Sequence, residues 1–162
     1  MSSHSKAKGF VTFRSISTTS KEVIREDKFP NAVLRVGRRD LVASLGGVSK
    51  SGHVRITHIA IGTGGVDNFG NLLPVSEDQP GLIGGESSVK ALIEAQVTLF
   101  PAPEASIMVR GILPSQSSAN GHKMTQLGLV LSTGNYYAVR TWDGPTKDSS
   151  ITNEIEWEVE IL

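Results

Sequence analysis

Residues 52–74 read GHVRITHIAIGTGGVDNFGNLLP, and they contain in order a short strand, a glycine-rich turn and a long polar loop. The strand signal is an alternation in which small or apolar residues share one parity: Val54, Ile56 and Ala60. Ile59 and Ile61 occupy the other parity, so we expect the far end of this strand to be buried on both faces. The chain turns immediately afterwards, because Gly62, Gly64 and Gly65 follow, and a tight turn is expected there.

The chain after the loop consists of short apolar segments separated by Pro, Gly, Asn and Ser, which is typical of antiparallel strands. We expect strands at residues 89–100, 106–113, 123–131, 136–141 and 151–162.

The last of these segments shows the clearest alternation in the chain. Ile155, Trp157, Val159 and Ile161 share one face, and Glu154, Glu156, Glu158 and Glu160 share the other. Residues two apart on a strand face lie roughly 6.5–7 Å from one another, so the four carboxylates repel unless water or cations surround them. Two interpretations are open: a solvent-facing sheet edge that uses charge against unwanted pairing, or a surface that matches Lys and Arg of the N-terminal segment or of a partner.

One helix is expected, over residues 31–45. Its apolar residues follow a period of 3.6, with Asn31 as N-cap and Gly46 and Gly47 as the stop. The apolar positions are Leu34, Leu41, Val42 and Leu45. Arg38 falls near this stripe and Arg39 lies beside it, so the stem of Arg38 is expected to pack while its charged end reaches solvent.

The N-terminal residues 1–28 are rich in Ser, Thr and Lys, and they are expected to form an extended basic arm. Their short apolar patch contains Phe10, Val11, Phe13 and Ile16. Residues 1–55 hold 11 Lys and Arg and 4 acids (11 − 4 = +7), whereas residues 56–162 hold 5 and 12 (5 − 12 = −7). The arm therefore has three interpretations: docking on an acidic protein surface, a solvated leader, or the less favoured nucleic-acid contact.

These elements predict a mainly β (α+β) fold. We expect an antiparallel β-sandwich-like domain over residues 29–162, with one N-terminal helix and the extended arm over residues 1–28. A chain of 162 residues with 38% hydrophobic residues fits one such domain. Neither a membrane-spanning segment nor a secretory signal is present in the sequence, and the chain contains 0 Cys. We therefore expect a protein made in the cytosol that contacts no membrane.

Candidate sites for chemistry each lack a required residue. The Gly62–Gly65 turn has neither the lysine nor the following helix of a phosphate-binding loop. His53 and His58 are five apart on a strand and point to opposite faces, so they cannot share a metal. A calcium loop beginning at Asp67 would need a glutamate where Asp78 stands. No arrangement for nucleophilic or acid–base catalysis is recognisable, so we expect no enzyme activity, cofactor or metal.

Two blocks of sequence resemble the N-terminal domain of tail fibre and baseplate-attached proteins of bacteriophages with contractile tails. The first corresponds to a strand of the form ITxxAIGxGG and the loop after it: Ile56, Thr57, Ala60, Ile61, Gly62, Gly64, Gly65, Pro74, Leu82 or Ile83, and Glu86. The second is the strand MTQLGLV at 124–130, the turn GPTK at 144–147 and the tryptophan-bearing strand IEWEV at 155–159. Gln126 stands where the family usually has glutamate, and Val130 where it often has an aromatic residue.

The resemblance implies a structural virion protein, assembled in the host cytoplasm, that acts by docking as a baseplate component or a tail fibre attachment adaptor. Its partners would be other tail, baseplate or fibre proteins, and a trimer or several copies in a symmetric tail are expected. Nucleic acid and membrane are not expected partners. The residues expected to contact partners lie on the arm, the helix and the last strand: Phe10, Phe13, Ile16, Arg38, Arg39, Glu154, Glu156, Glu158 and Glu160.

The alternative function is a small carbohydrate-binding module on the virion. Tyr136, Tyr137 and Trp142 form an aromatic cluster, and aromatic side chains stack on sugars as well as they fill protein interfaces. Tyr136 and Trp142 would contact the glycan, together with the loops at 62–81 and 114–122. Alternation places Tyr136 and Tyr137 on opposite faces of a strand, so we expect one of them, and also Trp157, in the core.

Overall fold

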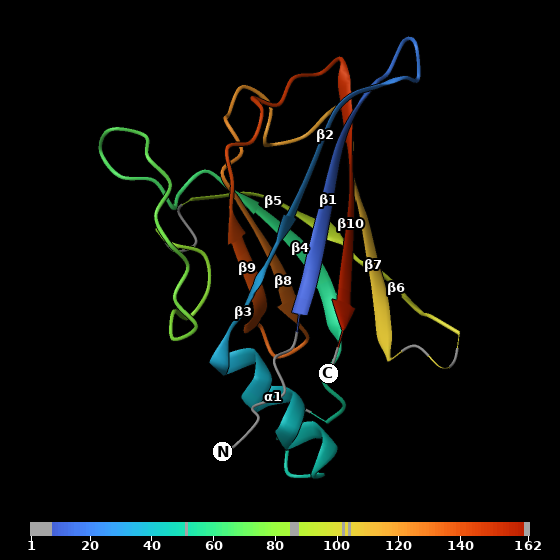
Figure 1. Cartoon of the computed structure of the whole chain (residues 1–162), viewed down its shortest axis with the longest axis vertical. Coiled ribbons are helices and arrows are strands. Elements are labelled where there is room, and N and C mark those ends of the chain that lie inside the picture. Colours follow the sequence, from blue (N-terminus) through green and yellow to red (C-terminus); the bar gives the residue numbers. More distant parts are fainter. Residues whose placement is uncertain (1–7, 51, 85–87, 102, 104, 161–162) are drawn as a thin grey trace.

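Two five-stranded antiparallel sheets pack face to face in this computed structural model, which describes residues 8–50, 52–84, 88–101, 103 and 105–160 (Figure 1). Sheet A has the order β2 (Val23–Pro30), β1 (Lys8–Ser17), β10 (Ile151–Glu160), β7 (Ser106–Leu113) and β6 (Gln96–Leu99). Sheet B has the order β3 (Ala32–Val33), β9 (Tyr136–Thr141), β8 (Gln126–Leu131), β4 (Ile56–Gly62) and β5 (Val89–Glu94). The predicted antiparallel, sandwich-like architecture is confirmed.

The core lies between the inner faces of the two sheets. Period-two alternation in β1 and β10 supplies part of it, and in β10 the residues Ile155, Trp157 and Val159 point inward while the glutamates between them point outward. Sheet B is also covered on its outer face, where Leu34, Leu82 and Ala60 form a second buried cluster. This second layer explains why the far end of β4 is buried on both sides, as its sequence predicts.

The prediction of an extended arm over residues 1–28 is wrong for the residues that the structure describes. β1 and β2 form a hairpin within sheet A, and β1 pairs with β10 from Lys8↔Glu160 to Ser17↔Ile151. Val11 and Phe13 are fully buried, and the Phe13 ring lies 5.2 Å from the Trp142 ring. The domain therefore includes β1 and β2 and does not begin at residue 29, whereas residues 1–7 lie outside the described part.

β10 is the central strand of sheet A and not its edge, so the interpretation of its glutamates as protection of a sheet edge is wrong. The sequence could not reveal this, because every residue that pairs with β10 lies at least 40 positions away in the chain (153 − 113 = 40 for the nearest pair, Asn153↔Leu113). Its inward face is as buried as the alternation predicts, and Trp157 is in the core as expected.

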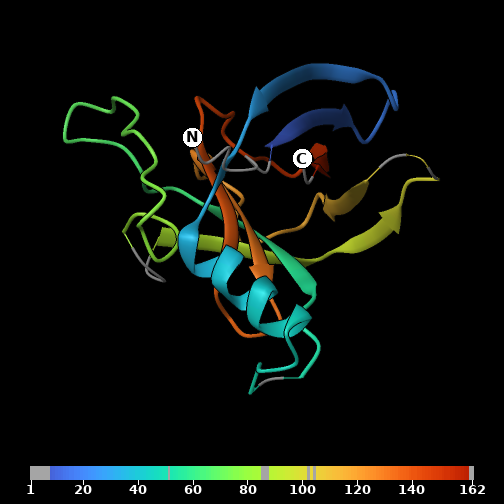
Figure 2. The same cartoon turned by 60° about the horizontal axis from the view of Figure 1, so that its bottom comes forward.

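The helix α1 (Arg35–Leu45) begins later than predicted, because Leu34 and not Asn31 occupies the N-cap position. Its end at Gly46 and Gly47 is as predicted, and Gly47 has the positive φ that favours glycine. Gly37 is buried against β9, and a Cβ there would collide with the backbone of Tyr137. This close approach holds the helix against one end of the sandwich (Figure 2).

Replacing Phe13 by alanine should destabilise the fold strongly, since it removes a fully buried ring that contacts Trp142. We expect a loss of about 3–5 kcal/mol in the free energy of unfolding, measured by denaturant titration. The matched control is Phe10→Ala on the same strand, whose side chain is 46% exposed and should lose less than about 1 kcal/mol. Equal effects of the two substitutions would contradict the burial of β1.

Candidate docking groove between the two sheets

The segment predicted to be one strand, residues 89–100, forms two strands and changes sheets at Ala95. Up to Glu94 it pairs with β4 in sheet B, and from Gln96 it pairs with β7 in sheet A. The Ala95 amide makes the last bond to this part of sheet B, donating to the Thr57 carbonyl oxygen at 3.0 Å. Beyond this point β6 and the start of β4 diverge, and the two sheets lie open to solvent between them.

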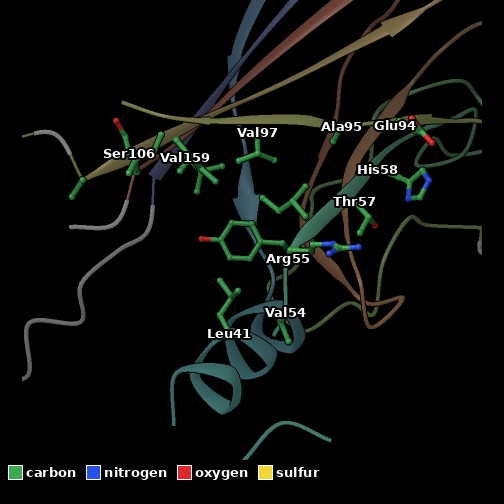
Figure 3. A pocket seen from close by; sticks show the side chains of 15 residues that line it. Leu41, Val54, Arg55, Thr57, His58, Glu94, Ala95, Val97, Ser106 and Val159 are labelled. Atoms are coloured by element: carbon green, nitrogen blue, oxygen red, sulfur yellow. The ribbon is translucent and has the colours of Figure 1, made fainter. Parts of the chain in front are cut away.

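An apolar groove of about 780 Å³ occupies this opening (Figure 3). Its walls come from both sheets and from the helix. They include Val97 and Leu99 of β6, Val159 of β10, Ile56 at the start of β4, Val54 just before that strand, and Leu41 of α1. A volume of this size lies within the range of ligand and peptide sites in proteins.

β6 is unusual because its inward-facing side chains are not covered. Val97 and Leu99 lie opposite Val109 and Ile107 of β7, on the face of sheet A that is otherwise buried. Val97 is nevertheless 46% exposed and Leu99 is 73% exposed. Contiguous exposed apolar side chains beside a groove are typical of interaction sites.

Polar groups lie along the side of the groove formed by β4 and β5. Arg55 is exposed and makes no ion pair within the described residues, whereas His58 and Glu94 are cross-strand neighbours. Tyr137 lines the same cavity, and its burial raises the pKa of the phenol, so the hydroxyl stays neutral at physiological pH. The groove is therefore apolar in its interior and carries a cation at its margin.

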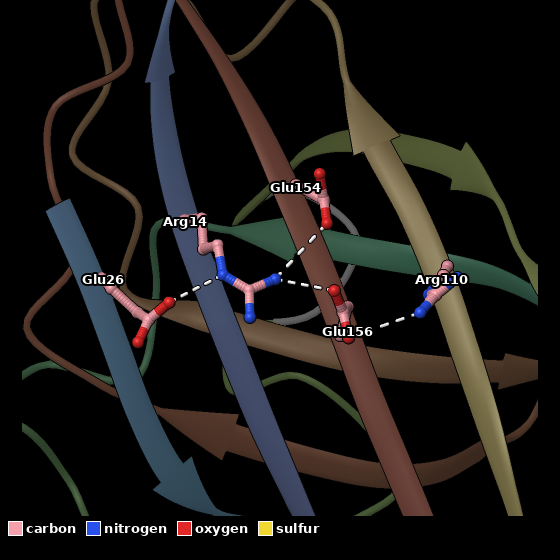
Figure 4. A network of polar contacts seen from close by, with 5 residues as sticks. All are labelled: Arg14, Glu26, Arg110, Glu154 and Glu156. Atoms are coloured by element: carbon pink, nitrogen blue, oxygen red, sulfur yellow. Dashed lines mark hydrogen bonds and ion pairs between the residues drawn. The ribbon is translucent and has the colours of Figure 1, made fainter. Parts of the chain in front are cut away.

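The outer face of sheet A carries a network of charges around the glutamates of β10 (Figure 4). Arg14 contacts Glu156 at 2.6 Å, Glu154 at 3.3 Å and Glu26 of β2 at 2.6 Å. Arg110 of β7 lies 3.8 Å from Glu156 on the other side. The hydrogen bond from Arg14 holds the pKa of Glu156 below its ordinary value, although partial burial opposes this shift. Of the two interpretations of the glutamate stripe, the structure thus favours a match with cations of the N-terminal segment.

The residues predicted to contact partners do not form one surface. Phe13 is fully buried and cannot contact a partner in this fold, and Phe10 and Ile16 lie on the outer face of sheet A. Arg38 pairs with Glu77 at 2.8 Å, and Arg39 is an exposed helix residue. Glu154 and Glu156 are held by Arg14, whereas Glu158 and Glu160 continue the stripe as half-buried side chains.

The predicted glycan contacts are not supported by the structure. Trp142 is only 5% exposed, and its ring packs against Phe13 and Phe29, so no sugar can stack on it. Tyr136 is half-buried over Gly81 and Gly128, where a Cβ would collide with its ring. Of the two tyrosines, Tyr137 is the core residue.

The two sequence blocks that resemble the phage family, residues 56–86 and 124–159, contact one another in the fold. The GTGG turn packs on the start of β8, where the Thr125 hydroxyl donates to the Gly64 carbonyl and the Gln126 amide donates to the Ile83 carbonyl. A Cβ at Gly64 would collide with the same Ile83 carbonyl, so the turn requires glycine there. These residues are therefore positioned for packing, in agreement with the tight turn expected at this place.

Lys147 of the GPTK turn is also structural. Its side chain is buried, and its ammonium donates to the carbonyl oxygens of Ser115, Asp148 and Ile151. Burial lowers the pKa of Lys147, and the nearby Asp148 carboxylate opposes that shift. The interaction ties the loop after β7 to the start of β10.

Asp67 caps its own loop and does not present a cation site. Its carboxylate accepts hydrogen bonds from the backbone amide and the side chain of Asn71 and from the backbone amide of Phe69, and these bonds, those from Asn71 above all, lower its pKa. Across the described part of the chain, no three His, Cys, Asp or Glu side chains gather where a metal ion could bind. In the same residues no helix has the length and apolar character that a membrane crossing needs.

Comparison of the chain with family models, with curated proteins and with solved structures finds no match.

None of the residues that form the walls of the groove was a predicted contact, so the groove was not predicted from the sequence. One local signal was present: the segment QVTL at 96–99 contains no charge and no proline, although it begins an exposed edge. That signal becomes meaningful only once the strand is known to be an edge, which depends on the crossing at Ala95.

Replacing Arg14 by methionine should destabilise the protein near neutral pH, because Glu154 and Glu156 lose the cation that lies between them. We expect a loss of about 1–2 kcal/mol in the free energy of unfolding. The folded pKa of Glu156 lies below its ordinary 4.5, so the interaction contributes fully above 4.5 and is lost as the pH falls through the folded value.

The difference between the wild type and Arg14→Met should therefore shrink below about pH 4. Urea titrations at several pH values measure it. The control is Arg39→Met on the exposed helix surface, for which we expect little change at any pH. A difference for Arg14→Met that stays constant down to pH 2 would contradict the assigned role of Glu156.

Proposed function

We propose that this chain is a structural protein of a contractile bacteriophage tail, acting as a baseplate component or as an adaptor that attaches a tail fibre. The observation that carries the proposal is the groove beside β6, where Val97 and Leu99 leave apolar surface uncovered at a sheet edge. Surface of this kind favours a protein that is held by neighbours. The resemblance of residues 56–86 and 124–159 to fibre and baseplate-attached proteins supplies the identity of those neighbours.

The mechanism in this proposal is assembly and not turnover. Several charged side chains in the described fold are engaged in structural contacts: Arg14 neutralises glutamates of β10, Lys147 fastens two loops, and Asp67 caps a turn. The partners are other tail, baseplate or fibre proteins, and the chain is placed in the virion as a trimer or in several symmetric copies.

The proposal predicts that the protein is a stoichiometric part of purified tails. Deleting its gene from the phage that encodes it should give tails lacking the protein, with fibres or baseplate parts missing in negative-stain images. Supplying the purified protein to these tails should restore its cosedimentation with them. Fully infectious particles of normal appearance from the deletion strain, together with no cosedimentation, would overturn the proposal.

A further inference from the structure

Sheet A has two edge strands, and they differ in how they resist pairing with other chains. The edge strand β2 reads VIREDKFP, with four successive charged residues and a proline, both of which discourage the addition of a further strand. The edge strand β6 reads QVTL and carries neither. The same sheet is thus protected at one edge and unprotected at the other.

The backbone of β6 presents hydrogen-bonding groups on the side away from β7. The Phe100 amide donates to the Ser106 carbonyl on the β7 side. Thr98 and Gln96 lie two and four residues before Phe100, so their backbone groups also point towards β7. In an antiparallel ladder the alternate residues point their amide and carbonyl groups to the opposite side. Those residues are Val97 and Leu99, and Ala95, which has the same parity, does bond in that direction to Thr57.

The same two residues also turn their side chains toward the groove. Val97 and Leu99 therefore offer, at one place, backbone groups for a strand ladder and apolar side chains that a new neighbour would cover. A strand placed beside β6 would continue sheet A, and its alternate side chains would enter the groove.

We propose that the groove is a strand-acceptor site: an extended segment of a partner protein pairs with the open edge of β6. The segment carries apolar side chains at alternate positions, which pack against Val97 and Leu99. It also carries a carboxylate near one end, because Arg55 lines the same cavity as an exposed cation without an ion pair in the described structure. This inference rests on the proposed function only for the identity of the partner as a tail protein.

Charge and sequence distinguish this occupant from two others. The N-terminal residues of the chain itself read MSSHSKA and lack the alternating apolar side chains that the groove requires. A second copy could pair β6 with β6 about Thr98, placing Val97 opposite Leu99. The strand QVTL, however, has no carboxylate to offer Arg55, so a partner segment satisfies the site better than a second copy does.

The first experiment uses the purified full chain and a synthetic ten-residue peptide that alternates valine with threonine and ends in glutamate. Amide exchange followed by NMR should show rapid exchange at Val97 and Leu99 in the free protein, and at least about tenfold slower exchange with the peptide. The same peptide ending in glutamine should bind more weakly, and Arg55→Gln should abolish that difference.

The matched variants test the edge directly. Leu99→Lys places a charge in the groove, and Val97→Pro removes an outward-facing amide that β7 does not use. Each should raise the Kd for the peptide by at least about tenfold while leaving thermal unfolding nearly unchanged. Ile24→Lys on the edge strand β2 is the control, since it adds the same charge to an exposed residue at the other edge.

Three outcomes would overturn the inference. The first is no slowing of amide exchange at Val97 and Leu99 with millimolar peptide, and the second is equal affinity of the wild type and Leu99→Lys for the peptide. The third is protection of these amides in the peptide-free protein that rises with protein concentration. The last result, with a dimer in sedimentation analysis, would assign the site to a second copy.

Cosedimentation of the variants with tails separates the two proposals. If the wild type and Leu99→Lys both bind tails equally, the strand-acceptor inference fails and the proposed function stands. If the peptide binds as expected but no variant and no wild type associates with tails, the acceptor site stands and the proposed function fails.

Discussion

The pairing of β1 with β10 is the contact on which the rest of the structure depends. It joins strands from the two ends of the described chain over ten residue pairs, from Lys8↔Glu160 to Ser17↔Ile151. It also makes β10 a central strand whose Trp157 side chain is buried, and it brings Phe13 against Trp142. A ladder between such distant segments forms late or cooperatively, because the entropy of closing a long loop must be offset by many contacts at once.

The same pairing determines the electrostatics of the outer face of sheet A. Four glutamates on one strand face repel one another. The neighbouring strands place Arg14 beside Glu154 and Glu156, and Arg110 beside Glu156. The lopsided charge of the sequence is therefore partly an internal feature of the fold, in which basic residues near the N-terminus neutralise acids near the C-terminus. A stripe that is neutralised in this way has less charge left to steer a partner.

Local patterns in the sequence predicted the elements whose environment is local. The strands at 106–113 and 136–141 have the predicted bounds, and the end of α1 lies at the glycines that predict it. The hairpin of β1 and β2 was missed because its alternation of Val11 and Phe13 with polar residues lies within a segment rich in Ser, Thr and Lys. Its burial depends on β10, which no window of neighbouring residues contains. The docking groove was missed for a related reason, since the segment 89–99 has one strand pattern but divides between two sheets at Ala95.

The division at Ala95 is also what gives the fold an open site. A sandwich is closed when the inner face of every edge strand is covered by the opposite sheet. β5 and β6 are two halves of one segment. Sheet B could cover β6 only if β4 ran along β6 as it runs along β5. β4 instead continues beside β8. Val97 and Leu99 are thus exposed by the topology and not by a loose core. Substitutions of these two side chains should therefore affect binding more than stability, which is the property expected of a surface shaped for a neighbour.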